Sequence, residues 1–188
     1  MITTSGLPPT AASKGTQAMP SNRLSETETY VSLLNKRRDE VRGVLRGLPA
    51  EALNWLPLPR NRGDVRLGYS IYQLGYHSIV TEVDWRRHIA YRLGRITWEE
   101  EQAGFEIGEM EVVGEDTALL LARLERDGAA TDQFILGLSD DDLHVTWENA
   151  RGEPRSVRWI IGHVIAYYGV QIGQMVLTRQ LWEQQRGR

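Results

Sequence analysis

The chain has 188 residues, a formal net charge of −3 and no cysteine. The missing cysteine excludes disulfides, thiolate chemistry and cysteine-ligated metals, and it fits a reducing cytoplasm. The slightly acidic balance gives no basic surface for nucleic acid, so no nucleic-acid partner is expected. No uninterrupted apolar run approaches 18 residues, so we expect no transmembrane helix and no membrane partner. The length suits one domain with a sizeable core.

Residues 1–24 are rich in Ser, Thr, Pro, Gly and Ala and lack the apolar stretch of a secretory signal. We interpret them as a flexible tail, with either Met1 or Met19 as the start, followed by one domain over residues 25–185. Ser25 and Glu28 form a capping-box pattern, which predicts a first helix over 26–47.

The next segments continue the helical pattern. Residues 53–69 contain several Pro and Gly residues and predict a long, irregular connection that can carry the chain across a bundle. Ser70 and Gln73 repeat the capping box and predict a second helix over 70–93. Residues 95–114 are acidic and are interpreted as a surface connection with at most a short helical turn.

Two more helices complete the pattern. Apolar residues at heptad spacing predict a third helix over 115–138. Alternation around an Ala-Arg-Gly turn predicts a small hairpin or flap within 143–155, and Ser156 then caps a fourth helix over 156–184. Four such helices predict an all-α four-helix bundle with a long crossover connection, a fold that builds its sites in the bundle core.

The fourth helix carries polar residues on the face that we expect to pack inward. Three–four spacing puts these residues on one face: Ile160, His163, Tyr167, Val170, Gln174, Leu177 and Leu181. A buried polar group without a partner costs about 1–3 kcal/mol. His163, Tyr167, Gln171 and Gln174 therefore either form an internal network or line a binding site.

The stretches LNWLPLP, SIYQLGYHSIVTEVDWRRH and LSDDDLHVTWENARGEPRSVRWIIGHVIAYYGVQIGQM resemble the DinB/YfiT-like superfamily, which includes the DUF664 proteins. The resemblance covers residues 26 to 182. It implies a four-helix bundle with a long crossover, often dimeric. In many members three histidines bind a divalent metal, and some members are metal-dependent thiol transferases or isomerases.

The resemblance places His77 at the metal ligand of the second helix. It places Tyr167 and Gln171 where the two ligand histidines of the last helix usually stand, and His163 one turn earlier. A neutral phenol and an amide are poor ligands for zinc, nickel or iron. We therefore interpret the family's metal site as degenerate, with His77 and His163 as the only candidate metal ligands.

Three features of the sequence each allow two interpretations. Arg38, on the inner seam of the first helix, binds an anionic ligand or pairs with Glu82 or Asp84. Glycines beside the polar cluster leave room for a ligand or allow close packing between helices or copies. The tryptophans near the helix ends seal the core or form the mouth of a pocket.

We therefore predict a cytoplasmic, non-catalytic or small-molecule-binding homodimer with a degenerate metal site. The candidate ligand-binding residues are His77, His163, Tyr167, Gln171, Gln174 and Arg38. No cofactor is expected; a divalent zinc, nickel or iron ion is the alternative. With that ion the protein would be a metal-dependent thiol (S-)transferase or isomerase that uses His77 and a non-standard ligand set.

Overall fold

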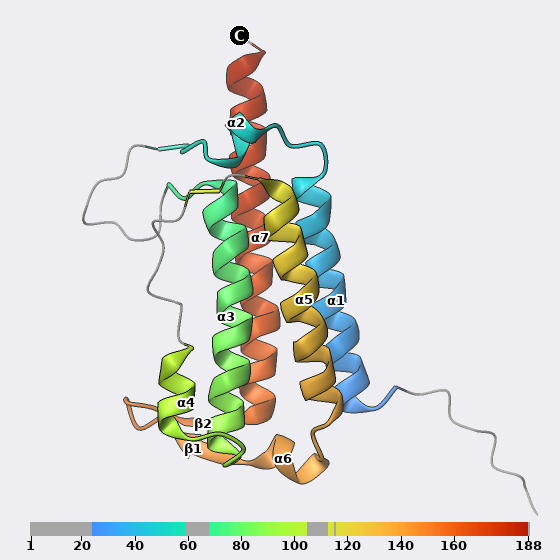
Figure 1. The fold of residues 1–188 in the computed structure, drawn as a ribbon, viewed down its shortest axis with the longest axis vertical. Coiled ribbons are helices and arrows are strands. Elements are labelled where there is room, and N and C mark those ends of the chain that lie inside the picture. The colour runs from blue at the N-terminus through green and yellow to red at the C-terminus, as the bar shows by residue number, and fades with distance from the viewer. Residues whose placement is uncertain (1–23, 59–67, 105–112, 115, 188) are drawn as a thin grey trace, which may run out of the picture.

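Four long helices form the body of the protein (Figure 1). The computed structural model describes residues 24–58, 68–104, 113–114 and 116–187. The long helices are α1 (Glu26–Leu45), α3 (Ile71–Arg92), α5 (Thr117–Leu136) and α7 (Val157–Arg186). They confirm the predicted all-α four-helix bundle and lie within a few residues of the predicted bounds.

Side-chain caps explain where the long helices begin. Ser25 with Glu28 and Ser70 with Gln73 form the two predicted capping boxes, each satisfying two backbone N–H groups. The Asp116 carboxylate accepts a hydrogen bond from the backbone N–H of Ala118 and caps α5. Ser156 caps α7, as its sequence predicts.

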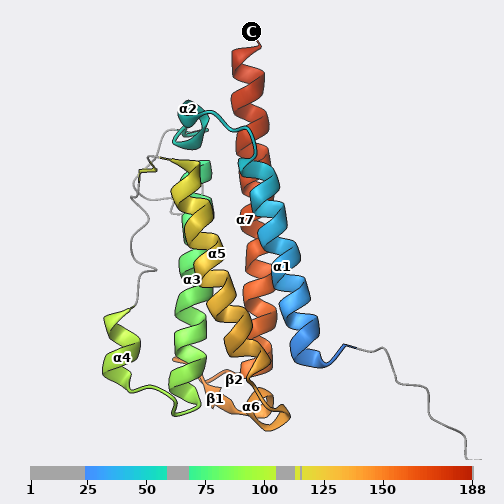
Figure 2. The ribbon, with the colours of Figure 1, turned by 45° about the vertical axis from the view of Figure 1, so that its right-hand side comes forward.

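The helix directions produce an unusual connectivity. Followed along the chain, α1 and α7 run toward one end of the bundle, and α3 and α5 run toward the other (Figures 1 and 2). Each long helix packs against two others, so that α1 and α3 lie on one diagonal and α5 and α7 on the other. The connection between α1 and α3, which contains α2 (Ala50–Leu53), therefore carries the chain across the bundle as predicted.

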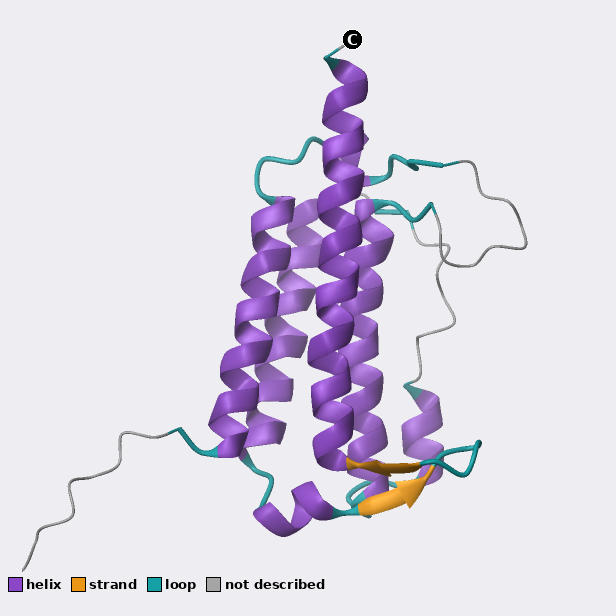
Figure 3. Cartoon of the chain, turned by 180° about the vertical axis from the view of Figure 1, so that it is seen from behind, coloured by secondary structure: helices purple, strands orange, loops and turns teal. Residues whose placement is uncertain are grey.

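The lengthwise crossover lies elsewhere. Because α3 and α5 are parallel, the end of α3 and the start of α5 lie at opposite ends of the bundle, and part of the connection between them, which the sequence suggested as a surface connection, lies outside the described residues. The connection begins with the short helix α4 (Trp98–Ala103). At the same end of the bundle, α6 (Asp140–His144) leads into the predicted hairpin of β1 (Thr146–Glu148) and β2 (Pro154–Ser156), seen from behind in Figure 3. The strands are antiparallel, with Trp147 opposite Arg155.

The buried face of α7 is not the predicted one. Val170, Leu177 and Leu181 are exposed, the first two by more than half. Most of the residues that pack into the core follow a predicted inward residue by one position in the sequence. The buried residues of α7 are Val157, Ile160, Ile161, Val164, Tyr168, Gln171, Ile172, Met175 and Thr178. One residue is about 100° of helix rotation. The prediction failed because α7 carries apolar residues nearly all round, so that periodicity alone does not define its inner face.

By length and composition alone, α7 could also cross a membrane. One side of α7 packs against α1 and α3. Core helices of soluble proteins also meet this criterion of length and composition. Most of the tail expected over residues 1–24 lies outside the described residues.

Candidate functional site

A cluster of polar side chains joins all four long helices in the middle of the core. Arg38 of α1 is 1% exposed and its guanidinium meets Glu82 of α3 in a two-pronged ion pair, with Nη2–Oε1 and Nε–Oε2 distances of 2.7 and 3.2 Å. Its Nη1 donates to Asp132 of α5 at 2.8 Å and to Asn35 at 2.9 Å. Tyr168 of α7 donates its hydroxyl to Glu82 at 2.7 Å. We call these five residues the central network.

The central network explains how these charges can be buried. Burial alone would lower the pKa of Arg38, but its hydrogen bonds to Glu82 and Asp132 raise it above the usual value. Burial and the neighbouring Glu82 raise the pKa of Tyr168, so its hydroxyl stays protonated and donates. Arg38 thus pairs with Glu82, one of the two carboxylates suggested by the sequence. Because its guanidinium is already engaged by protein groups, the structure offers no support for an anion site at Arg38.

A glycine makes room for the central network. Gly128 on α5 lies against the Arg38 side chain, and an added Cβ there would be 2.8 Å from Nε and 3.0 Å from Cδ. The missing side chain lets the long Arg38 pass between α1 and α5 toward the diagonal helix α3.

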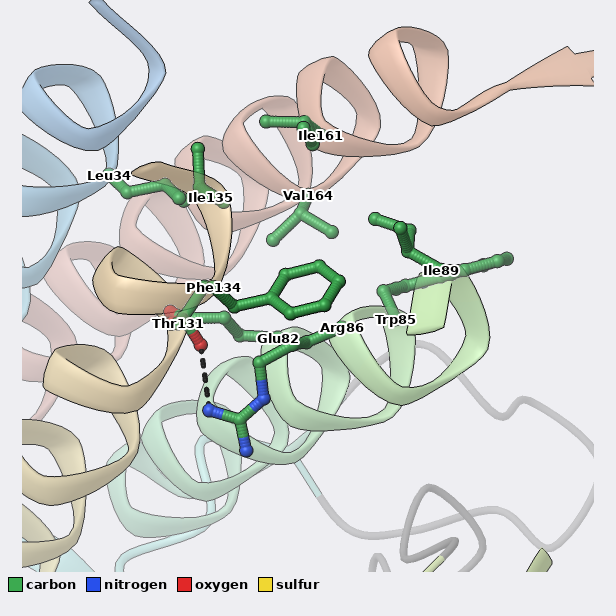
Figure 4. A pocket seen from close by; sticks show the side chains of 10 residues that line it. All are labelled: Leu34, Glu82, Trp85, Arg86, Ile89, Thr131, Phe134, Ile135, Ile161 and Val164. Atoms are coloured by element: carbon green, nitrogen blue, oxygen red, sulfur yellow. Dashed lines mark hydrogen bonds between the residues drawn. The ribbon is translucent and has the colours of Figure 1, made fainter. Parts of the chain in front are cut away.

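A small cavity adjoins the network (Figure 4). It measures about 20 Å³ and is lined mainly by apolar side chains, with Glu82, Arg86 and Thr131 as its polar members. Arg86 donates to the Thr131 hydroxyl at 3.2 Å, the bond dashed in Figure 4. This volume matches about one water molecule and is too small for an organic ligand.

A second polar group lies where α3 meets α7. The rings of His77 and Tyr167 meet edge to face, with centroids 5.5 Å apart. Gln171 follows Tyr167 by one turn and is 6% exposed. His77 Nδ1 and Gln171 Oε1 are both buried and neither has a hydrogen-bond partner among the described protein atoms. Burial lowers the pKa of His77, so its imidazole is neutral at pH 7. We call His77, Tyr167 and Gln171 the α3–α7 cluster.

The other two predicted site residues lie beside this cluster. His163 reaches Tyr167 at a ring-centroid distance of 6.3 Å, but it stacks on Trp159 at 4.9 Å and meets the edge of Trp85 at 5.9 Å. Burial and the nearby Arg155 charge lower the pKa of His163. Gln174 is only partly buried, one turn beyond Gln171.

The residues of the α3–α7 cluster do not fit the family's three-histidine metal site. A catalytic transition-metal site generally needs three imidazole or carboxylate ligands. The described part of the chain contains no group of three His, Cys, Asp or Glu side chains able to hold an ion. His77 is the one imidazole of the cluster, and its ring neighbour Tyr167 is a phenol, so we derive no chemistry through a metal.

Sequence reasoning missed most of the polar residues that the fold brings together. Asp132 and Tyr168 of the central network gave no motif, because each lies among ordinary helical residues. His88 and Glu101 were also missed: His88 Nδ1 lies 2.6 Å from Glu101 Oε1 although the two belong to different helices. In the sequence, the central network was indicated only by Arg38, a charged residue among the apolar residues on the inner face of the first helix.

The fold and the α3–α7 cluster define a four-helix bundle protein whose second and third long helices are parallel and which has a polar cluster between α3 and α7. The model of the DinB superfamily matches residues 33–175, and the chain belongs to this superfamily. No curated protein matches it.

Two solved structures are similar. YfiT from Bacillus subtilis, a probable metal-dependent hydrolase with an unusual four-helix bundle topology, is 14% identical, with a TM-score of 0.61 over 87% of this chain and 92% of its own. A conserved protein from Enterococcus faecalis is 16% identical, with a TM-score of 0.62 over 85% of this chain and 98% of its own. At these identities the likeness concerns the fold alone.

Proposed function

We propose that this DinB superfamily member binds a small polar molecule at the α3–α7 cluster and performs no metal-dependent reaction. The observation that carries the proposal is the pair of buried, unpartnered atoms, His77 Nδ1 and Gln171 Oε1. Leaving such atoms unpaired costs about 1–3 kcal/mol each, so a molecule that hydrogen-bonds to both recovers that free energy. The ligand would therefore be a small molecule that carries hydrogen-bonding groups, seated beside the Tyr167 ring.

The rival function is the metal-dependent one. It draws support from the resemblance of the fold to YfiT and from the neutral His77 imidazole, the form that binds metals. Against it stand Tyr167 and Gln171 at the two positions where the family usually has histidine. The two functions predict different effects of chelation on the melting temperature of the protein.

Chelation should leave the melting temperature of the unmodified protein unchanged. A bound ion stabilises the folded state by RT ln(1 + [L]/Kd), so a tightly held metal would make the melting temperature fall by several degrees on chelation. Calorimetry of untagged protein with and without EDTA measures this. A clear fall would contradict the proposal and support the metal-dependent function.

The double variant Tyr167→His with Gln171→His tests the placement of the cluster directly. It should bring three imidazoles together and raise zinc or nickel affinity by at least about 100-fold, as three-ligand sites require. Isothermal titration measures the affinity. The same double variant with His77→Ala is the control and should lose the gain. Without a gain that depends on His77, the assignment of these positions to one site is wrong.

We propose further that the protein is a cytoplasmic homodimer that assembles through the outward face of α7. Three–four spacing aligns seven exposed apolar or small residues there: Trp159, Gly162, Ala166, Val170, Gly173, Leu177 and Leu181. We call this the outer stripe. Added Cβ atoms at Gly162 and Gly173 would meet no described atom within 4 Å, so packing among the described residues does not require glycine at either position. The two glycines would let the helix of a second copy approach closely.

The variant Val170→Glu with Leu177→Glu should convert the dimer to a monomer. Two charges buried in an apolar interface are costly, while the same side chains on a free surface are solvated. Light scattering should give twice the 21.4 kDa chain mass for the unmodified protein and the single mass for the variant. Leu119→Glu, at an exposed leucine of α5, is the control and should stay dimeric. Monomeric unmodified protein at micromolar concentrations would refute the proposed assembly.

A further inference from the structure

A pocket of about 390 Å³ lies at the end of the bundle that carries the hairpin. Its walls come from the end of α3, from α4, from the hairpin and from the start of α7, which meet at that end in Figures 1 and 3. Three tryptophans line it: Trp85 of α3, Trp147 of β1 and Trp159 of α7. The volume is that of a small organic ligand, and the pocket shares no lining residue with the α3–α7 cluster.

The acidic residues of the pocket are deeply buried. Asp84 is 3% and Glu101 is 5% exposed, and both line the pocket. Glu101 Oε1 lies 2.6 Å from His88 Nδ1, whereas Glu101 Oε2 is buried and has no hydrogen-bond partner in the part of the chain that the structure describes. A carboxylate removed from water in this way needs a donor or a positive charge to offset its desolvation.

The histidine beside Glu101 reaches only one of the two carboxylate oxygens. Arg92 donates its Nε–H to His88 Nε2 at 3.3 Å, and a guanidinium can only donate. Glu101 thus has His88 as the partner of Oε1, and Oε2 has no partner among the described residues.

The two arginines of the pocket contact its tryptophans. Arg155 pairs with Glu153 and lies over the Trp159 ring, 4.1 Å from its centroid. Arg92 contacts the Trp147 ring at 5.4 Å and is solvent-exposed at the rim. The lining therefore combines three indole rings and two carboxylates with these two guanidiniums, and Glu101 Oε2 is left without a partner among the described residues. A cation that donates to this oxygen and contacts the indole rings fits the pocket.

We propose that this pocket binds a small organic ammonium ion that carries an aromatic or other apolar group. The ammonium would donate to Glu101, and the apolar group would lie among Trp85, Trp147 and Trp159. This site is separate from the α3–α7 cluster and does not depend on the function proposed for that cluster.

Three probes of matched shape test the chemistry: 2-phenylethylammonium, the neutral 2-phenylethanol and the anionic phenylacetate. Titration calorimetry on the full chain should show the ammonium bound at least about 10-fold more tightly than the alcohol, because only the ammonium can form a charge-assisted hydrogen bond to Glu101 and cation–π contacts with the indole rings. Phenylacetate should bind most weakly. Equal affinity for the ammonium and the alcohol, preference for the anion, or no binding of any probe would overturn the proposal.

Two variants locate the binding. Glu101→Gln removes the charge but keeps the shape, and should weaken ammonium binding about 10-fold while leaving the alcohol unchanged. Glu99→Gln, on the exposed side of the same short helix, is the matched control and should bind as the unmodified protein does. Trp147→Ala on the hairpin, outside the four-helix core, should weaken both probes even where Glu101→Gln fails to fold. Ammonium binding that survives both Glu101→Gln and Trp147→Ala would place it outside this pocket.

Discussion

Glu82→Ala should lower the free energy of unfolding by about 3–5 kcal/mol, because it leaves the Arg38 guanidinium buried without its main counter-charge. The loss also removes the acceptor of the Tyr168 hydroxyl. Domains of this size are stable by roughly 5–15 kcal/mol, so the variant would lose a large part of its stability. Urea denaturation followed by circular dichroism measures the change.

Glu125→Ala is the matched control for this experiment. Glu125 also pairs with an arginine of α1, Arg42, at 2.6 Å, but its side chain is 58% exposed. Exposed ion pairs contribute about 0–1 kcal/mol. If Glu82→Ala destabilises no more than Glu125→Ala, the central network contributes nothing beyond a surface ion pair, and its assignment as a stabilising element fails.

Gly128→Ala should destabilise the fold by about 1–3 kcal/mol, the usual cost of overpacking a core. The added methyl group would push into an Arg38 side chain that four hydrogen bonds hold in place. Gly43→Ala, at a position of α1 where nothing lies within 4 Å, should instead stabilise by up to about 1 kcal/mol through helix propensity. Thermal or urea unfolding of the two variants should therefore shift in opposite directions. A stabilised Gly128→Ala variant would show that Arg38 can move aside freely.

The helices were predictable because their signals are local. Ser25 with Glu28 marks one helix start and Ser70 with Gln73 marks another. Each signal spans only four residues, and the structure shows both capping boxes. The rotation of α7 was not predictable in this way. Its outer stripe and its core face are both apolar, so the choice between them depends on which face the other three helices cover.

The candidate site was predictable only in part, for a related reason. His77, Tyr167 and Gln171 were noted as polar residues in apolar surroundings, and the structure brings the rings of His77 and Tyr167 together. Their shared role remains a proposal. Glu101 belongs to a six-residue helix within an acidic segment, where one buried carboxylate looks like its exposed neighbours. Only the tertiary fold distinguishes it.

The diagonal placement of α1 and α3 has a consequence for the order of events during synthesis. Their native neighbours are α5 and α7, and α5 begins only at Thr117. A nascent chain that ends before this residue holds two long amphipathic helices that are not native neighbours. Domains generally fold as units, and here the faces of α1 and α3 that pack on α5 and α7 have no native partner until those two helices leave the ribosome. The Arg38–Glu82 ion pair, which spans the diagonal, can then close only late, once α5 and α7 have excluded water around it.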